Sequence, residues 1–137
     1  MIETALMCLA MNIYHEARSE SIAGQYAVAD VVLNRVESKN YPNTVCEVVK
    51  QAKLWEGKPI RNKCQFSWYC DGKRDEPTDT FSWQQSVEVA IMINNHKRFR
   101  GITEGATHYH TNYVDPFWNK DYKLVTTIDN HIFYREY

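Results

Sequence analysis

Apolar residues at steps of three and four predict two helices in the first part of the chain. The first covers residues 2–17. The second begins at Ser19 or Ser21, whose hydroxyls are suitable caps, and ends near Val36. The second helix has so many apolar positions that we expect it to be central and covered on most sides. Asp30 and Asn34 interrupt these positions, so each needs a polar partner inside the protein.

Two further helices and a loop are expected in the middle of the chain. Thr44 and Glu47 have the spacing of a capping box, which predicts a short third helix. Residues 53–63, which contain Gly and Pro, are predicted to form a loop. A fourth helix is expected to begin at Asp79 or Thr80 and to end near His96. Its predicted inner face consists of Trp83, Val87, Ala90, Ile91 and Asn94.

The period of the pattern changes to two near the C-terminus, which indicates strands. They are expected over residues 106–110, 123–128 and 132–134, and Asp129-Asn130 has the composition of a tight hairpin turn. With helices first and strands last, the pattern predicts one α+β domain over residues 1–137.

Composition and charge narrow the possible partners. The net charge of the 137 residues is −1 and no Lys/Arg-rich run is present, so nucleic acid is not an expected partner. No apolar run approaches the ~20 residues of a membrane span. The N-terminus lacks the basic flank and apolar run of a signal peptide. We therefore expect a protein that is made in the cytoplasm and does not insert into a membrane. We also expect it to be a monomer.

The four cysteines are not spaced as zinc ligands, because no C-x-x-C pair occurs. Cys8 lies among apolar residues of the first helix, which predicts a buried thiol. Cys64 and Cys70 can form a disulfide if the chain turns between them, and the sequence leaves this open. No pairing is predicted for Cys46.

Glu16 continues the apolar stripe of the first helix, seven residues after Leu9 and three after Ile13. A carboxyl in that position is poorly solvated, so either its pKa is raised or an arginine such as Arg18 or Arg35 neutralises it. A raised pKa suits a general acid that works near neutral pH, whereas an ion pair suits a purely structural role. The pattern alone leaves both interpretations open.

Other chemistries are less well supported by the sequence. His15-Glu16 begins an H-E-x-x-H zinc motif, but the second histidine would be residue 19, which is Ser. His108 and His110 lie two apart on a predicted strand and so share a face, where they could bind a metal or simply form hydrogen bonds. No G-x-S-x-G elbow supports a serine nucleophile.

Acid–base cleavage of a glycosidic bond fits Glu16 better. Such chemistry often uses a second carboxylate but needs no cofactor and no metal. The possible second groups are Glu20, Asp30, Asp71 and Asp115.

Several ordered blocks of the sequence resemble the SleB/CwlJ cell wall hydrolases. They are EARSE at residues 16–20, GQYAVA at 24–29, VLNRV at 32–36, CQFSWYCDG at 64–72, GATHYH at 105–110 and IDNHIFY at 128–134. Together they cover almost the whole chain. Ser19 stands where the family motif has Gly, and Asp129 stands where the final block often has Gly.

The resemblance implies a helix-rich, lysozyme-like domain with a small antiparallel sheet, which cleaves the glycan strands of peptidoglycan. It also implies that Glu16, the first glutamate of the family's E-A-R-G-E block, acts first as acid and then as base. The expected activity is that of a lytic transglycosylase, in which the muramoyl C6 hydroxyl attacks C1 and leaves a 1,6-anhydro end. A compact phage-type endolysin that reaches the wall after release or export fits this picture.

We expect the substrate groove between the end of the Glu16 helix, the segment 65–71 and the strand at 108–109, because these blocks combine aromatic and polar residues suited to sugars. The candidate substrate-binding residues are Glu20, Gln65, Ser67, Trp68, Tyr69, Asp71, His108 and Tyr109. Three alternatives remain: a hydrolytic muramidase that uses water, a metal-dependent N-acetylmuramoyl-L-alanine amidase that uses the two histidines, and a non-catalytic wall-binding module.

Overall fold

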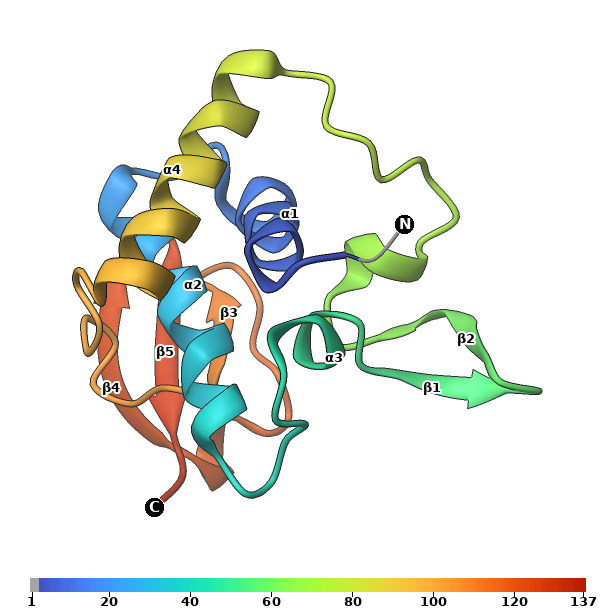
Figure 1. Cartoon of the computed structure of the whole chain (residues 1–137). Coiled ribbons are helices and arrows are strands. Elements are labelled where there is room, and N and C mark those ends of the chain that lie inside the picture. The colour runs from blue at the N-terminus through green and yellow to red at the C-terminus, as the bar shows by residue number, and fades with distance from the viewer. Residues whose placement is uncertain (1–2) are drawn as a thin grey trace.

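A helical layer leads into a small antiparallel sheet, and a separate hairpin projects between the third and fourth helices (Figure 1). The structure is a computed structural model and describes residues 3–137. The α-helices are α1 (Ala5–Ala17), α2 (Ile22–Glu37), α3 (Val45–Val49) and α4 (Thr80–His96). The strands are β1 (Ala52–Trp55), β2 (Lys58–Cys64), β3 (His108–Thr111), β4 (Lys123–Ile128) and β5 (His131–Arg135). Two 3₁₀-helices are η1 (Ser67–Cys70) and η2 (Asn119–Asp121). This arrangement confirms the α+β class.

A side-chain oxygen caps the N-terminus of each of these α-helices. The caps are Thr4, Ser21, Thr44 and Asp79, and each accepts a hydrogen bond from the backbone N–H three residues further on. The structure therefore selects Ser21 rather than Ser19 as the start of α2 and confirms the predicted capping box at Thr44. Residue 2, where the first helix was predicted to begin, lies outside the described residues.

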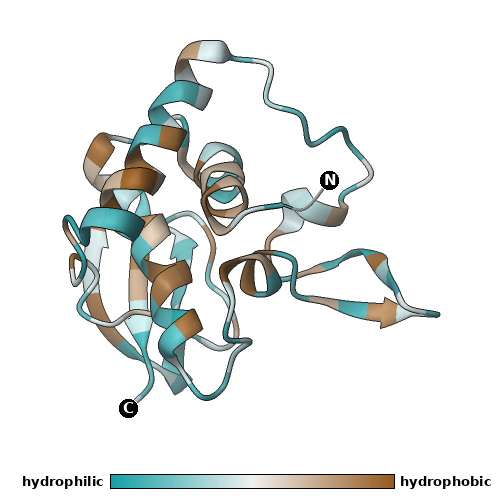
Figure 2. Cartoon of the chain, viewed as in Figure 1, coloured by the Kyte–Doolittle hydropathy of each residue, from teal (hydrophilic) through white to brown (hydrophobic). Residues whose placement is uncertain are grey.

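The core lies where α1, α3 and α4 pack around α2. Val28, Val31 and Val32 of α2 are fully buried, which confirms the central position predicted for this helix. Figure 2 shows hydrophobic segments on α2 and α4. The inner face of α4 differs in part from the prediction, because Ser86, Val89 and Ile93 are buried instead of Ile91 and Asn94. The buried face of α4 is therefore rotated relative to the predicted one. The sequence does not reveal this because Ser86 is polar and so is not expected inside. Its hydroxyl donates a hydrogen bond within the helix to the carbonyl oxygen of Ser82 at 2.9 Å.

The two polar residues that interrupt α2 bind the loop that follows α4. The carboxylate of Asp30 pairs with Arg100 and accepts hydrogen bonds from the backbone N–H and the hydroxyl of Thr103, at 3.1 and 2.6 Å. Asn34 Nδ2 donates to the carbonyl oxygen of Ala106 at 2.8 Å. These contacts confirm that both residues need internal partners, and they fix the loop that leads to the sheet.

The sheet has the strand order β3-β5-β4, and both pairs are antiparallel. Phe133 of β5 is fully buried and packs against Ala27 and Val31 of α2, so one face of the sheet covers this helix. The three predicted strands and the turn between the last two are confirmed. Asp129 in this turn has a left-handed backbone (φ 52°), and its carboxylate accepts hydrogen bonds from Ser21 N and Oγ at 3.0 and 2.5 Å.

The prediction of a loop at residues 53–63 was wrong. This segment forms most of the antiparallel β1–β2 hairpin, whose turn residues Glu56 and Gly57 both have positive φ. All residues from 53 to 63 are exposed, so neither strand has the alternation of buried and exposed positions that reveals a strand in a sequence.

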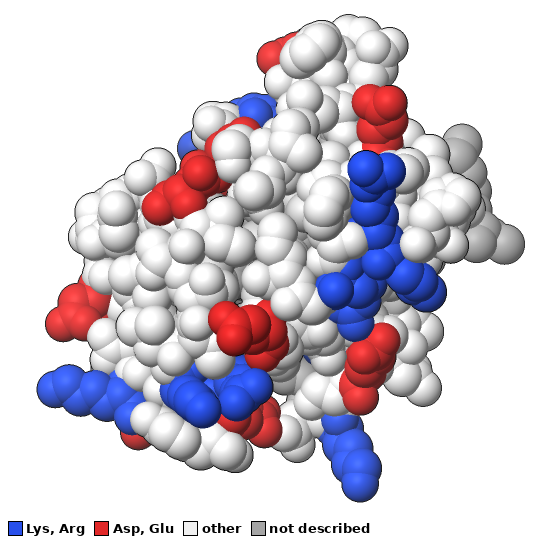
Figure 3. All heavy atoms as spheres, turned by 90° about the vertical axis from the view of Figure 1, so that its left-hand side faces the viewer, with Lys and Arg blue, Asp and Glu red and all other residues white. Residues whose placement is uncertain are grey.

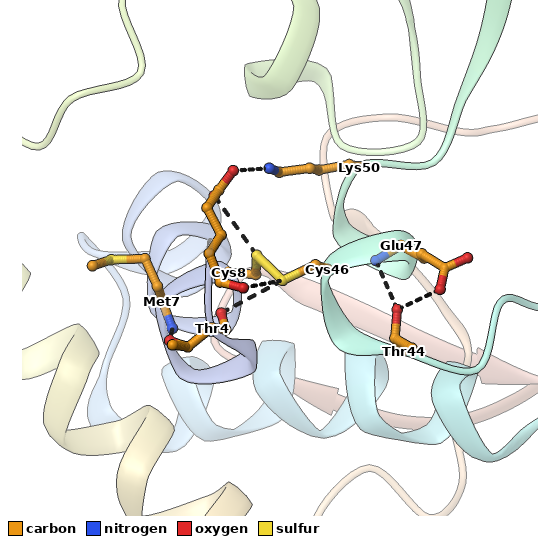
Figure 4. The surroundings of a disulfide bond; sticks show 8 residues. Thr4, Met7, Cys8, Thr44, Cys46, Glu47 and Lys50 are labelled. Atoms are coloured by element: carbon orange, nitrogen blue, oxygen red, sulfur yellow. Dashed lines mark hydrogen bonds and ion pairs between the residues drawn. A yellow bond between two sulfur atoms is a disulfide. The ribbon is translucent and has the colours of Figure 1, made fainter. Parts of the chain in front are cut away.

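The prediction of a buried thiol at Cys8 was right about burial and wrong about the thiol. Cys8 is buried but forms a disulfide with Cys46, which joins α1 to α3 (Figure 4). Lys50 and Glu3 form an ion pair beside it. The pairing depends on how α3 packs on α1, which the helical pattern does not encode. A second disulfide joins Cys64 and Cys70, because η1 turns the chain between them.

Within residues 3–137, no helix is both long enough and apolar enough to cross a membrane.

Candidate active site

A cavity of about 530 Å³ opens beside the C-terminal end of α1. Its walls come from α1, from η1 and from the irregular segment 71–78. The lining residues are Tyr14, His15, Glu16, Arg18, Ser67, Trp68, Asp71, Lys73, Arg74, Glu76 and Thr78. Acidic, basic and aromatic side chains therefore meet in one hollow.

Glu16 is the carboxyl of α1 that lines this cavity. Burial raises its pKa, and this effect outweighs two opposing influences, the hydrogen bond from Tyr109 and the positive charge of Arg35. Tyr109 Oη donates to Glu16 Oε1 at 2.5 Å. The side chain is thus oriented by a phenol and retains its proton at a higher pH than an exposed glutamate does.

An arginine does not neutralise Glu16 directly. Among residues 3–137, no ion pair within 4 Å involves the Glu16 carboxylate. Arg35 Nε instead donates to the carbonyl oxygen of Thr107 at 2.7 Å, and Arg18 Nη1 donates to the carbonyl oxygen of Tyr14 at 3.2 Å. Of the two interpretations that the sequence left open, the geometry therefore favours a carboxyl with a raised pKa over a structural ion pair.

Two ring contacts shape the wall next to Glu16. The rings of His15 and Trp68 stack with their centroids 4.6 Å apart, and Trp68 Nε1 donates to Asn12 Oδ1 at 2.8 Å. His15 Nε2 lies 2.7 Å from the carbonyl oxygen of Asp75. These contacts hold η1 and the segment 71–78 against the end of α1.

Tyr14 anchors the far end of the same segment. Its hydroxyl accepts hydrogen bonds from the backbone N–H groups of Thr78 and Asp79, both at 3.1 Å. The bonds from these backbone groups also lower the pKa of Tyr14.

The structure brings together half of the sequence-predicted site. Ser67, Trp68 and Asp71 line the cavity with Glu16, and Tyr109 contacts Glu16 directly. The predicted meeting of the Glu16 helix, the segment 65–71 and the strand at Tyr109 is therefore present in the structure.

Five candidate substrate-binding residues do not line this cavity, and Tyr109 is one of them although it contacts Glu16. The other four have partners elsewhere. Glu20 Oε1 lies 3.8 Å from His131 Nδ1. Gln65 Oε1 accepts a long hydrogen bond of 3.5 Å from Arg35 Nη1. Tyr69 packs against the hydrophobic core, and the ring of His108 stacks on Tyr122 at 4.1 Å.

Sequence reasoning missed the cationic part of the cavity, which consists of Arg18, Lys73 and Arg74. Arg18 belongs to the block at residues 16–20, but the sequence indicates it only as a possible partner of Glu16. Lys73 and Arg74 lie in a polar segment without any periodic pattern. Only the path of the chain between η1 and α4 shows that they line the same cavity as Glu16.

His108 and His110 lie on one face of β3, since both rings contact Trp118. His110 Nε2 lies 2.8 Å from the hydroxyl of Tyr134, and His108 Nδ1 lies 3.0 Å from the hydroxyl of Thr107. Burial and the nearby charge of Arg35 lower the pKa of His108 to about 4. No group of three or more His, Cys, Asp or Glu side chains within residues 3–137 is arranged to hold a metal ion. The contacts therefore agree with the hydrogen-bonding interpretation of these two histidines.

A helical core with a small antiparallel sheet, and a poorly solvated glutamate beside an open cavity, is the arrangement of lysozyme-like enzymes that act on glycans. Residues 19–134 match the family described as Cell Wall Hydrolase, and the chain belongs to this family. The match begins three residues after Glu16.

Curated relatives and solved structures agree with this family. A spore cortex-lytic enzyme of Bacillus cereus is 48% identical over 44 residues, which are 32% of this chain and 17% of the relative. The enzyme of Bacillus subtilis with the same description is 49% identical over 41 residues, 30% of this chain and 13% of the relative. The matches thus span less than a fifth of these relatives' length.

Structural similarity extends over nearly the whole chain. The catalytic domain of the germination-specific lytic transglycosylase SleB from Bacillus anthracis has a TM-score of 0.71 and 26% identity, with 98% of this chain and 97% of that chain covered. The catalytic domain of the Bacillus cereus SleB protein has a TM-score of 0.66 and 24% identity, with 96% and 89% covered. The fold is therefore that of the SleB catalytic domains, as the resemblance in the sequence implied.

Proposed function

We propose that this protein cleaves the glycan strands of peptidoglycan as a lytic transglycosylase and that Glu16 is its catalytic acid and base. The observation that carries the proposal is the carboxyl of Glu16, whose pKa is raised by burial while it lines a cavity large enough for sugar rings. Membership of the cell wall hydrolase family and the similarity to a germination-specific lytic transglycosylase support the choice of substrate.

In the proposed reaction, protonated Glu16 donates its proton to the oxygen of the glycosidic bond as the bond to C1 of the muramoyl residue breaks. The resulting carboxylate then accepts the proton of the muramoyl C6 hydroxyl, whose oxygen attacks C1 and closes the 1,6-anhydro ring. Glu16 ends the cycle protonated, so protons balance and no water is consumed. Tyr109 keeps the carboxyl aimed during both transfers through its hydrogen bond to Oε1.

This scheme needs no carboxylate nucleophile, because a group of the substrate attacks C1. Among the possible second carboxylates, Asp71 lines the cavity, and its Oδ1 accepts the backbone N–H of Lys73 at 2.9 Å. Glu20 faces His131 instead. A hydrolytic muramidase would use the same acid with water in place of the C6 hydroxyl. We place the site of action at the bacterial cell wall, reached by export or release, where the protein works as a monomer.

Mass spectrometry of purified peptidoglycan after digestion tests the proposal. Anhydromuramoyl ends are the expected product, and the Glu16→Gln variant should form none under the same conditions. Reducing ends would identify a muramidase, freed stem peptides an amidase, and unchanged material a wall-binding module. A digestion in the presence of a strong chelator serves as a further arm, because loss of activity that zinc restores would support the amidase.

A further inference from the structure

The β1–β2 hairpin projects from the body of the protein (Figure 1). Some of its large apolar side chains are exposed to solvent. Trp55 is 71% exposed and Leu54 is 60% exposed. Exposed apolar groups of this size contribute little to folding, and when they gather in one place they mark an interaction surface. Both faces of the hairpin are uncovered, since all its residues from 53 to 63 are exposed.

The hairpin is also positively charged, although the whole chain has a net charge of −1. It contains four cations, Lys53, Lys58, Arg61 and Lys63, and one anion, Glu56, so its net charge is +3. Among residues 3–137, no ion pair within 4 Å involves any of these five side chains. On the face of the molecule opposite the hairpin, by contrast, acidic and basic side chains lie next to one another (Figure 3). The hairpin therefore presents unneutralised positive charge, which favours an anionic partner.

Strand register places aromatic and cationic groups together. Trp55 pairs with Lys58, and Leu54 pairs with Pro59. Directly paired residues share a face of the hairpin, so the indole of Trp55 and the ammonium of Lys58 lie on the same side, with Ile60 two residues further on. An indole face stacks on the apolar face of a sugar ring, while an ammonium binds carboxylates.

The hairpin continues directly into the wall of the cavity. β2 ends at Cys64, whose disulfide to Cys70 spans η1 with Ser67 and Trp68 of the cavity. The guanidinium of Arg61 lies so close to Gly72 that a Cβ there would come within 2.7 Å of it. Gly72 directly follows Asp71, which lines the cavity, so Arg61 of the hairpin lies against the segment that forms the cavity wall.

We propose that the β1–β2 hairpin is a second peptidoglycan-binding surface, in which Trp55 stacks on a sugar and Lys58 and its neighbours bind carboxylates of the stem peptides. The choice of this polymer rests on the proposed function, because β2 of the hairpin continues into the wall of the cavity in which a glycan strand would be cut. The hairpin thereby retains the enzyme on its insoluble substrate between cuts.

Sedimentation with insoluble peptidoglycan tests this surface. The Glu16→Gln variant is used as the parent, so that binding is measured without digestion, and the peptidoglycan is first stripped of phosphate-containing wall polymers. Adding Trp55→Ala should weaken binding at least about threefold, as expected for the loss of an aromatic contact. Adding Lys58→Gln should weaken it about two- to fivefold, and this effect should disappear when the stem peptides are removed by an amidase.

Two substitutions elsewhere serve as matched controls. Phe117 is 94% exposed and Lys120 is exposed, and neither lies in the hairpin or lines the cavity. Phe117→Ala and Lys120→Gln should leave sedimentation unchanged. Thermal melting of each variant confirms that it is folded.

Turnover separates this surface from the catalytic site. With Glu16 intact, the Trp55→Ala variant should cleave soluble glycans of short length at the wild-type rate. It should cleave insoluble peptidoglycan more slowly than the wild type does. Equal loss on both substrates, or unchanged sedimentation, would overturn the proposal. Binding to anionic vesicles without binding to peptidoglycan would also overturn it and would identify a membrane surface as the partner. Failure of the proposed function appears differently, as a wild-type protein that binds peptidoglycan but releases no anhydro ends.

Discussion

Tyr109 Oη lies 2.5 Å from Glu16 Oε1, although 93 residues separate them in the chain. Burial raises the pKa of Glu16, and the phenol partly offsets this by stabilising the ionised carboxylate. Glu16 in turn affects Tyr109. Burial and the nearby carboxylate raise the pKa of Tyr109 well above its ordinary value, so the phenol stays protonated and remains a hydrogen-bond donor. This pair joins the helical layer to the sheet at the point where the chemistry is proposed.

Tyr109→Phe should raise the pKa of Glu16 further. A hydrogen bond to a charged group is worth about 1.5–3 kcal/mol, which corresponds to about one to two pKa units. Because the reaction starts from protonated Glu16, the alkaline limb of the pH–activity profile should move to higher pH by about that amount. The maximal rate should fall, because the carboxyl of Glu16 is less well oriented without the hydrogen bond. Tyr26→Phe is the control, since this α2 tyrosine packs against Phe99 and does not line the cavity. An unchanged limb in Tyr109→Phe would show that the phenol does not tune the catalytic acid.

Glu16→Gln should be inactive but no less stable than the wild type at pH 7. The amide keeps the shape of the side chain but transfers no proton, and acid–base assistance is typically worth ~10²–10⁴-fold. The folded pKa lies above the ordinary value of 4.5, so Glu16 contributes its full stability below that value and loses it as the pH rises through the folded pKa. The stability advantage of Gln should therefore be present at neutral pH and shrink in acid.

Turnover and denaturant unfolding of Glu16→Gln, measured on one preparation from pH 4 to 8, check both parts of this prediction. An inactive variant that is also unfolded at neutral pH would instead indicate that Glu16 has a structural role.

The two disulfides should contribute unequally to stability. Cys8 and Cys46 are 38 residues apart and Cys64 and Cys70 only six, so the first restricts the unfolded chain more strongly. Replacing the first pair by alanines should lower the free energy of unfolding by about 4 kcal/mol and replacing the second pair by about 2 kcal/mol. Chemical denaturation of both double variants under oxidising conditions gives the comparison. A larger loss from the shorter loop would contradict it.

Gly24 and Asp129 should be energetically coupled. A Cβ on Gly24 would lie 2.5 Å from Asp129 Oδ2, the oxygen that accepts both hydrogen bonds from Ser21 at the start of α2. Gly24→Ala should therefore displace the Asp129 carboxylate and lower the free energy of unfolding. In an Asp129→Gly background, which also relieves the left-handed backbone at this position, the same substitution should be milder.

A double-mutant cycle of these two changes should show a coupling energy of about 0.5 kcal/mol or more. Additive effects would mean that the turn adjusts without loss of its hydrogen bonds to α2.

Hydrophobic periodicity predicts some features of the candidate site and leaves others undetermined. The apolar stripe of the first helix identified Glu16 as a poorly solvated carboxyl, because a helix turns by a fixed angle per residue and so assigns each residue to a face. Nothing in that stripe pointed to Tyr109 as its hydrogen-bond partner. Lys73 and Arg74 were missed for a related reason, since an irregular segment has no period from which to infer the direction of its side chains.

The sequence by itself determined the four helices, the capping box at Thr44, the final three strands, the burial of Cys8 and the poor solvation of Glu16, since these depend on residues close together in the chain. Only the tertiary structure decided that Cys8 pairs with Cys46, that Tyr109 reaches Glu16, and that residues 52–64 form a hairpin whose residues from 53 to 63 are all exposed. The physical reason is that hydrophobic periodicity records which face of a segment avoids water. It carries no information about which distant segment covers that face, or about strands held by backbone hydrogen bonds with both faces in solvent.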